Sequence, residues 1–455
     1  MIWLRGKQPL RTGMDLMHIL EGNTNQMDSG EFGYFIRTRF QDLTFQVGVL
    51  LVILTGFTIP VSTSLTSVCN LGIFICWGIS GQYRVTFACF KKYRIVTISV
   101  LLFFCLACSL IYTPEILSLA SRNLFKYRQF LMMPIYLTFF MDPHARKRGI
   151  QMFELALIVT LIASMVCWMF SIEGSVRLMD HAIFKNRITQ NILMSFLVYL
   201  AAWKFLEHPA RRWPYALLAV IATYNILAIV PGRSGYVALG ILIGLLMYQR
   251  LGVKGILPAA ACIGLIGLVT YQHSERFQNR INQVVKEIRE YRISNKSRNS
   301  VDLRLEFYGN GLQIAKTSPL MGSGVGSFAI KYRELMEQKG QVFTENPHNE
   351  YVMLLVQNGI IGVVLFLSFF WVSWNTTRGL TGIEQALGQA VLAVYLLVCM
   401  VNSLMLDTTE GCLFGYLVGL TLAGGITGIK VVQQEDHLKS TADPLSQAEP
   451  AREAA

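Results

Sequence analysis

The sequence predicts an all-α integral membrane protein with about twelve transmembrane helices and one large helical loop outside the membrane. Of the 455 residues, 53% are hydrophobic and 15% are charged, and the mean hydropathy is +0.43. This balance is far from that of a soluble globular domain. Apolar stretches recur along the chain, and about 20 helical residues suffice to cross a hydrocarbon core of about 30 Å. One long hydrophilic stretch separates the ninth apolar stretch from the tenth.

Hydropathy divides the chain into five segments. They are a cytoplasmic N-terminal segment at 1–44, nine membrane helices in 45–271, a loop at 272–349, three membrane helices in 350–430 and a disordered cytoplasmic tail at 431–455. No short apolar region followed by a small-residue cleavage site occurs near the start, so the first span is expected to be an uncleaved anchor. The twelve expected spans lie near 45–60, 66–80, 95–112, 128–141, 151–171, 190–203, 214–230, 235–248, 255–271, 350–375, 384–405 and 412–429.

The distribution of positive charge predicts the orientation. With the N-terminus in the cytoplasm, the short inner loops carry thirteen Lys and Arg residues and the short outer loops carry six. Inner loops of membrane proteins are enriched in these cations, so both termini are expected in the cytoplasm. The net charge of +12 follows from this topology. It therefore indicates contact with anionic lipid and gives no reason to expect a nucleic-acid partner.

The loop at 272–349 is expected to be structured. The stretches ERFQNRINQVVKEIREYRI and VDLRLEFYGNGLQIAKTSP both place apolar residues at helical spacing, which predicts amphipathic helices over the membrane surface. The following SPLMGSGVGSF lacks the glycine spacing and the preceding strand of a dinucleotide site. It is interpreted as a hinge or as a place where two backbones approach each other.

The stretch NPHNEYVMLLVQNGIIGVV at the end of this loop contains the strongest functional candidate, His348. Asn346 and Pro347 predict a helix start, which places His348 in the first helical turn. The free amides and the positive end of the helix dipole there would keep the imidazole uncharged and able to accept a proton. Gly359 and Gly362 would share a helical stripe with His348 and let a neighbouring helix come close. The alternative is that His348 and Asn349 only bind lipid headgroups.

Three arginines at the outer ends of predicted helices are candidates for binding an anionic substrate: Arg187, Arg233 and Arg304. Each has a simpler explanation. Arg233 could reach the lipid headgroups, Arg304 could pair with Asp302, and Arg187 could be a surface cation. A neutral histidine and several arginines on one side of a membrane nevertheless suit transfer chemistry on a diphosphate-linked substrate, because guanidinium groups bind phosphate oxygens in pairs.

The spacing His348, Asn349, nine residues, Gly359-Ile-Ile-Gly362 resembles the H-[NSQ]-x9-G-x-x-G pattern of the O-antigen ligases of bacterial lipopolysaccharide assembly. These enzymes are part of a wider O-antigen ligase and polymerase superfamily. GRSGYVAL, with Arg233, and DLRLEFYGNGLQIAKTSPLMGSGVGSF, with Arg304, extend the resemblance over most of residues 180–375.

This resemblance implies a glycosyltransferase of the GT-C fold type in the bacterial inner membrane, with its active site on the periplasmic face. It would move O-antigen polysaccharide from undecaprenyl diphosphate to a sugar hydroxyl of lipid A-core, with inversion. By the same resemblance His348 would be the general base, and Arg233 and Arg304 would hold the diphosphate. Arg187 and Asn349 would also contact substrate.

No cofactor is expected. The outer loops lack the D-x-D pair with which many glycosyltransferases hold a divalent ion, which predicts metal-independent transfer. Four carboxylates near the outer surface could orient His348 or replace it as the base. They are Glu345, Glu350, Asp407 and Glu410.

Two other functions remain open. An O-antigen polymerase of the same superfamily would use a second lipid-linked repeat as acceptor. A transporter of lipid-linked glycans would need charged or broken helices in repeated positions. The expected spans are nearly free of charge at their centres and show no internal repeat, which favours an enzyme acting at the membrane surface.

Overall fold

The computed structural model describes residues 29–170, 181–230, 232–293, 300–339 and 343–426. Within these ranges every regular element is helical, and no strand occurs. The predicted cytoplasmic tail and most of the predicted N-terminal segment lie outside the described residues. The first half of the chain forms α2 (Ser29–Val61), α3 (Thr63–Ile79), α4 (Tyr83–Lys92), α5 (Arg94–Cys108), α6 (Leu117–Lys126), α7 (Gln129–Phe139), α8 (Pro143–Met169) and α9 (Arg187–Glu207).

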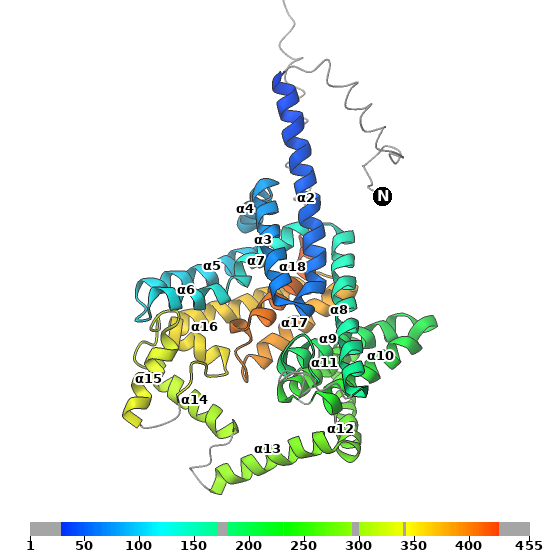
Figure 1. Cartoon of the computed structure of the whole chain (residues 1–455), viewed down its shortest axis with the longest axis vertical. Coiled ribbons are helices and arrows are strands. Elements are labelled where there is room, and N and C mark those ends of the chain that lie inside the picture. Colours follow the sequence, from blue (N-terminus) through cyan, green and yellow to red (C-terminus); the bar gives the residue numbers. More distant parts are fainter. Residues whose placement is uncertain (1–28, 171–180, 231, 294–299, 340–342, 427–455) are drawn as a thin grey trace, which may run out of the picture.

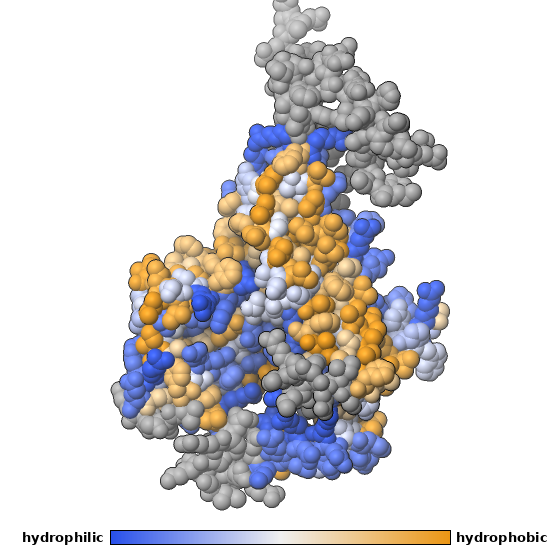
Figure 2. Space-filling model, in the orientation of Figure 1, coloured by the Kyte–Doolittle hydropathy of each residue, from blue (hydrophilic) through white to orange (hydrophobic). Residues whose placement is uncertain are grey.

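The second half continues through α10 (Arg212–Tyr224), α11 (Arg233–Leu251), α12 (Ile256–His273), α13 (Glu275–Ile293), α14 (Ser300–Ala315), α15 (Ser327–Lys339), α16 (Glu350–Thr377), α17 (Gly382–Val398) and α18 (Thr408–Leu422). Helix α2 projects from one end of the molecule, and α13 lies at the opposite end (Figure 1). Apolar side chains cover the projecting part of α2 below a hydrophilic outer end, whereas α13 presents a hydrophilic surface (Figure 2). This contrast fits a membrane anchor and a helix outside the bilayer.

Six helical stretches in the described ranges are long and apolar enough to cross a membrane. A seventh results if α3 and α4, which meet at a bend of 88°, form one broken span. The chain is therefore a multi-pass helical membrane protein. The six stretches are Arg37–Val61, Arg94–Ile111, Pro143–Met169, Pro209–Ile229, Arg233–His273 and Glu350–Thr377.

The predicted count of twelve spans is not confirmed, and α18 shows one reason. This helix has 15 residues, and every residue from Thr409 to Leu422 is buried among other helices. A helix that is apolar all round belongs either to a protein core or to a membrane span, and hydropathy does not separate the two. Helices α11 and α12 give a second reason, because two predicted spans form one apolar stretch of 41 residues, Arg233–His273.

Aromatic side chains hold the centre of the bundle together. Phe130 of α7 lies 5.5 Å from Phe369 of α16 and 6.1 Å from Phe414 of α18, measured between ring centroids. Tyr395 of α17 lies 4.8 Å from Phe414. Offset and edge-to-face pairs of this kind add about 0.5–1.5 kcal/mol each beyond the area that they bury. They fix α7, α16, α17 and α18 as one packed unit.

Helix α16 is kinked at Gly359, where φ is 62° and ψ is −160°. Essentially only glycine adopts this conformation. The close neighbour is the Gly-rich segment 318–326 and not another helix: a Cβ at Gly359 would overlap the Leu320 carbonyl, and one at Gly322 would overlap the Gln357 carbonyl. The expected glycine stripe shared with His348 is therefore wrong, because α16 begins after the histidine and is broken at Gly359. The interpretation of the Gly-rich segment as a backbone approach is confirmed.

Hydrogen bonds across the kink replace those that the helix loses. The amide of Ser323 donates to the Val356 carbonyl at 2.8 Å, and the amide of Gly324 donates to the Gln357 carbonyl at 2.8 Å. In the other direction, the Ile360 amide donates to the carbonyl of Pro319 at 2.9 Å. Buried backbone groups need such partners, so the segment 318–326 is part of the framework of α16.

Gly359→Ala is expected to destabilise the protein by at least about 1–3 kcal/mol, because alanine is strained at this φ and ψ and its Cβ overlaps the Leu320 carbonyl. A thermal melt of the purified protein, followed by tryptophan fluorescence, measures this. Gly264→Ala is the matched control, since α12 leaves open space around that position. Equal melting temperatures for the two variants would contradict the role of Gly359.

Candidate functional site

His348 lies in a tight turn just before α16. Its φ is 54°, in the left-handed region, and its amide donates to the side-chain oxygen Oδ1 of Asn346 at 2.8 Å. Ser403 Oγ donates to the same oxygen, also at 2.8 Å, so this turn is tied to the segment that follows α17. Histidine and asparagine populate the left-handed region more often than most residues. The turn presents the imidazole from an irregular segment, where functional side chains are frequent.

The expectation that Asn346 caps the helix and that His348 lies in its first turn is wrong. The cap is Asn349, whose side-chain oxygen accepts hydrogen bonds from the amides of Tyr351 at 3.0 Å and Val352 at 3.1 Å. Asn349 Nδ2 also donates to the Met400 carbonyl at 2.9 Å. These contacts engage both ends of the Asn349 amide, and its predicted contact with substrate stays a prediction.

Helix α14 brings Arg304 and Tyr308 to the histidine. Tyr308 Oη donates to the His348 carbonyl at 3.2 Å and lies 3.3 Å from the Met400 carbonyl. The Met400 carbonyl thus lies within hydrogen-bond distance of side chains from α14 and from the cap of α16. This shared acceptor fixes the position of α14, and with it Arg304, relative to His348.

The surroundings of His348 disfavour its charged form. Partial burial lowers its pKa from the ordinary value of 6.5, and the positive charge of Arg304 lowers it further. A hydrogen bond with the side chain of Asn402, which is buried, opposes both effects. These effects favour the neutral imidazole that the sequence predicts, and their causes are burial and Arg304. One ring nitrogen bonded to Asn402 leaves the other able to accept a proton.

The buried side chain of Glu350 holds the start of α16, next to His348, in place. It is fully buried, and its two carboxylate oxygens accept from Tyr127 Oη at 2.7 Å and from the Met405 amide at 3.1 Å. Lys126, for which the sequence suggested no role, lies close enough to interact electrostatically with Glu350 and Asp407. Glu350 therefore anchors the start of α16.

Arg187 and Arg233 belong to a neighbouring region. They are the first residues of α9 and α11, and a Cβ on Gly232 would lie 3.6 Å from the Arg187 carbonyl, so the two helix starts adjoin. Asn191 Nδ2 donates to the Val230 carbonyl at 2.6 Å and joins them further. The structure thus brings His348 and Arg304 together, and it brings the segments of Arg187 and Arg233 together.

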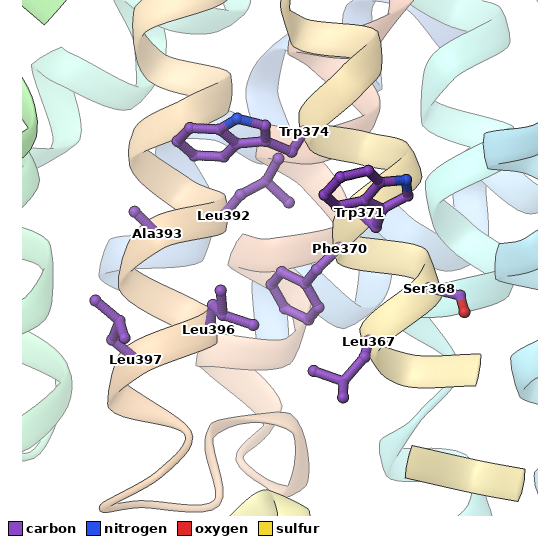
Figure 3. Close-up of a pocket in the computed structure, with 9 residues that line it drawn as sticks. All are labelled: Leu367, Ser368, Phe370, Trp371, Trp374, Leu392, Ala393, Leu396 and Leu397. Carbon is purple, nitrogen blue, oxygen red and sulfur yellow. The ribbon is translucent and has the colours of Figure 1, made fainter. Parts of the chain in front are cut away.

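Two cavities adjoin these regions. A polar pocket of about 520 Å³ is lined by Arg187 and by residues at the starts of α3, α9 and α18. An apolar groove of about 620 Å³ lies between α16 and α17, with Phe370, Trp371 and Trp374 on one side and Leu392 and Leu396 on the other (Figure 3). The carbonyl of Leu396, one of the lining residues, accepts a hydrogen bond from Tyr351 Oη at 2.6 Å. One wall of the groove is therefore tied to the first turn of α16.

In the described ranges, no group of three or more His, Cys, Asp or Glu side chains is arranged to hold a metal ion. The histidine site itself offers one imidazole and the positively charged Arg304. Its chemistry is that of a base beside a permanent cation, an arrangement suited to removing a proton from a hydroxyl and stabilising an anion nearby.

Sequence reasoning missed Tyr308, Asn402 and Ser403. Tyr308 stands four residues after Arg304, one helical turn on, and this spacing was available as a signal. Asn402 and Ser403 lie more than 50 residues after the histidine in a turn of no distinctive pattern. Only the packing of α17 and α18 brings that turn to His348.

Residues 218–367 match the model of a protein family described as O-antigen ligase. The matched segment contains Arg233, Arg304, His348 and Asn349, whereas Arg187 lies before it. An uncharacterized protein of Haemophilus influenzae is 21% identical over 183 residues, which cover 38% of this chain and 46% of that protein. The chain thus spans about half the length of this relative. The segment that carries the histidine turn, α14 and the start of α11 therefore assigns residues 218–367 to the O-antigen ligase and polymerase superfamily.

Proposed function

We propose that this protein is an O-antigen ligase, an inverting glycosyltransferase of GT-C type that acts on the periplasmic side of the bacterial inner membrane. It would move O-antigen polysaccharide from undecaprenyl diphosphate to a sugar hydroxyl of lipid A-core. Members of the matched superfamily are membrane enzymes of glycosyl transfer. The observation that carries the proposal is an uncharged, half-buried His348 beside Arg304 inside the matched segment.

In the proposed reaction the acceptor hydroxyl oxygen attacks the anomeric carbon of the donor sugar. As this bond forms, the bond from that carbon to the diphosphate oxygen breaks, and the proton of the hydroxyl passes to the free ring nitrogen of His348. Asn402 positions the ring through the other nitrogen. Undecaprenyl diphosphate leaves with the electron pair of the broken bond, and the proton on His348 is then lost to water.

Arg304 would stabilise the negative charge that grows on the leaving diphosphate. Its guanidinium stays charged at every relevant pH, so no acid is needed to protonate the leaving group. Arg233 would bind the same diphosphate or the first sugar from its place at the start of α11. The apolar groove between α16 and α17 supports a lipid-linked substrate, since it offers an apolar surface and its Leu396 is hydrogen-bonded to Tyr351, three residues after His348.

Reconstitution tests the function. Proteoliposomes that contain the purified protein, lipid-linked O-antigen and lipid A-core are expected to form O-antigen attached to lipid A-core, with or without a chelator. Electrophoresis of the lipid products separates the outcomes. Longer chains on the lipid-linked donor alone would identify a polymerase, the second candidate, because the matched family segment does not distinguish the two. Loss of activity with the chelator would contradict metal-independent transfer.

A further inference from the structure

The polar pocket of about 520 Å³ lies where three helices begin. Thr63 opens α3, the segment 182–187 leads into α9, and residues 407–410 open α18. Its volume lies within the range of small-molecule sites, about 300–1,000 Å³. It is separate from the apolar groove, which shares none of its residues.

The charges that line the pocket nearly cancel. Lys185 and Arg187 face two carboxyl groups, those of Asp407 and Glu410. Burial lowers the pKa of Lys185, with a smaller opposing effect of Glu410. Burial and repulsion by Asp407 raise the pKa of Glu410, which favours a carboxyl group that both donates and accepts. Two cationic side chains thus meet two carboxyl groups, and this mixed lining is a poor match for a multiply charged diphosphate or for a metal ion.

Hydroxyl and amide groups fill the rest of the polar lining. They come from Thr63, Asn186, Thr189, Thr408 and Thr409. Hydroxyls and amides both donate and accept hydrogen bonds, as the hydroxyls of a sugar do.

One apolar surface completes the lining. The ring of Phe184 is 37% exposed at the pocket and offers a face on which an apolar ligand surface can pack. Nearly balanced charges, several groups that both donate and accept hydrogen bonds, and one exposed ring suit an uncharged sugar.

The wall of the pocket is held in place by buried contacts. The Ile183 amide donates to Gln190 Oε1 at 2.9 Å, and Gln190 Nε2 donates to Ser164 Oγ at 3.1 Å. Ser164 Oγ donates in turn to the His181 carbonyl at 2.9 Å. On the other side, Thr189 Oγ1 donates to Glu410 Oε1. A preformed site loses less entropy on binding, so the pocket is organised before a ligand arrives.

A short run of chain joins the pocket to the histidine. Asn402 bonds to the His348 ring, the Met405 amide donates to Glu350, and Asp407 lines the pocket. Five residues of chain span at most about 18 Å, so the Cα atoms of Asn402 and Asp407 lie within that distance. A glycan whose reacting sugar lies at His348 is therefore within reach of the pocket through its neighbouring sugars.

We propose that this pocket is a carbohydrate subsite that holds an uncharged, hydroxyl-rich glycosyl unit of one of the two substrates. The inference rests on the proposed function, in that glycans are the substrates. It assigns Lys185, Asp407 and Thr408 to recognition of a sugar away from the bond that is formed. The donor glycan and the acceptor core are the two possible sources of that sugar.

Binding of lipid-free glycans to the full-length protein in nanodiscs tests the proposal without requiring transfer. Three probes are used: oligosaccharide released from the lipid-linked donor, dephosphorylated core oligosaccharide released from lipid A-core, and inorganic diphosphate. Saturation-transfer NMR is expected to show binding of one oligosaccharide, and which one identifies its source. In the parent, inorganic diphosphate is expected not to displace it.

Thr408→Trp fills the exposed rim of the pocket and is expected to weaken oligosaccharide binding at least about tenfold. Leu117→Trp, at a side chain of α6 that is 65% exposed, is the matched control and should bind like the parent. Asp407→Asn keeps the side-chain shape and removes the charge. It is expected to weaken binding about tenfold, which keeps the test decisive if the tryptophan variant folds poorly.

Equal binding by the parent, Thr408→Trp and Asp407→Asn would overturn the carbohydrate subsite. Displacement of the oligosaccharide by inorganic diphosphate would also overturn it and identify an anion site instead. His348→Asn separates this inference from the proposed function, since it should bind the oligosaccharide normally. A parent that binds the oligosaccharide but transfers no glycan would contradict the proposed function and leave the subsite standing.

Discussion

His348→Asn is expected to lower kcat/KM for glycan transfer by about 10²–10⁴-fold, the usual contribution of a general base. Asparagine removes the basic nitrogen and retains a side chain that tolerates the left-handed conformation, φ 54°, of this position. Alanine would combine loss of the base with backbone strain. The asparagine variant therefore isolates the chemical role, and transfer assays in proteoliposomes measure it.

A melting temperature equal to that of the parent would show that His348→Asn leaves the fold intact. Activity within about threefold of the parent would then remove His348 as the base, since loss of a general base has a far larger effect. In that event Glu345, Asp407 and Glu410, carboxylates that the sequence also offered, would become the candidates. Glu350 would not, because both of its oxygens are engaged by Tyr127 and Met405.

Arg304→Gln is expected to lower the rate by about 10²–10³-fold and to move the acidic limb of the pH profile to higher pH. A positive neighbour disfavours a second positive charge, so Arg304 lowers the pKa of His348. Below that pKa the imidazole is protonated and cannot accept a proton. The parent should therefore stay active to a lower pH than an ordinary histidine allows, and loss of Arg304 raises the pKa and shortens that range.

The measurement is the residual transfer rate of Arg304→Gln from pH 4.5 to 8, a range of about two units on either side of an ordinary histidine pKa. Lys316→Gln is the matched control. It removes an exposed positive charge just beyond α14 and should leave both the rate and the acidic limb unchanged. A rate loss without any change in the acidic limb would separate Arg304 from His348 and leave it a role in binding alone.

The sequence was sufficient for the class of protein and for the central pair of residues. The histidine motif and Arg304 of the preceding loop helix α14 were chosen by residue type and by position relative to the membrane, and the structure places them within electrostatic range of each other. The helix start near His348 was predicted from Asn346 and Pro347, but Asn349 offers an equal signal three residues later. The contact of Asn346 with Ser403 decides between them, and it depends on packing of segments far apart in sequence.

The sequence could not predict the number of spans, or that the helix starts carrying Arg187 and Arg233 adjoin each other, for a related reason. Hydropathy shows that a helix is shielded from water but not whether lipid or protein shields it, and α18 is shielded by other helices. Arg187 and Arg233, at the starts of α9 and α11, were selected like Arg304 as arginines at the outer ends of predicted helices. That the starts of α9 and α11 adjoin each other follows from how these helices pack, and no local pattern records it.

The break in α16 has a consequence for biogenesis. Without the Gly-rich segment, the buried carbonyls of Val356 and Gln357 in the kinked helix would lose the amide donors of Ser323 and Gly324, and an unpaired backbone group inside a membrane protein costs several kcal/mol. The part of α16 that precedes the kink at Gly359 should therefore be stable in the bilayer only after the Gly-rich segment has been translocated and has docked against it. Because residues 318–326 leave the ribosome before α16, vectorial synthesis delivers the docking partner first.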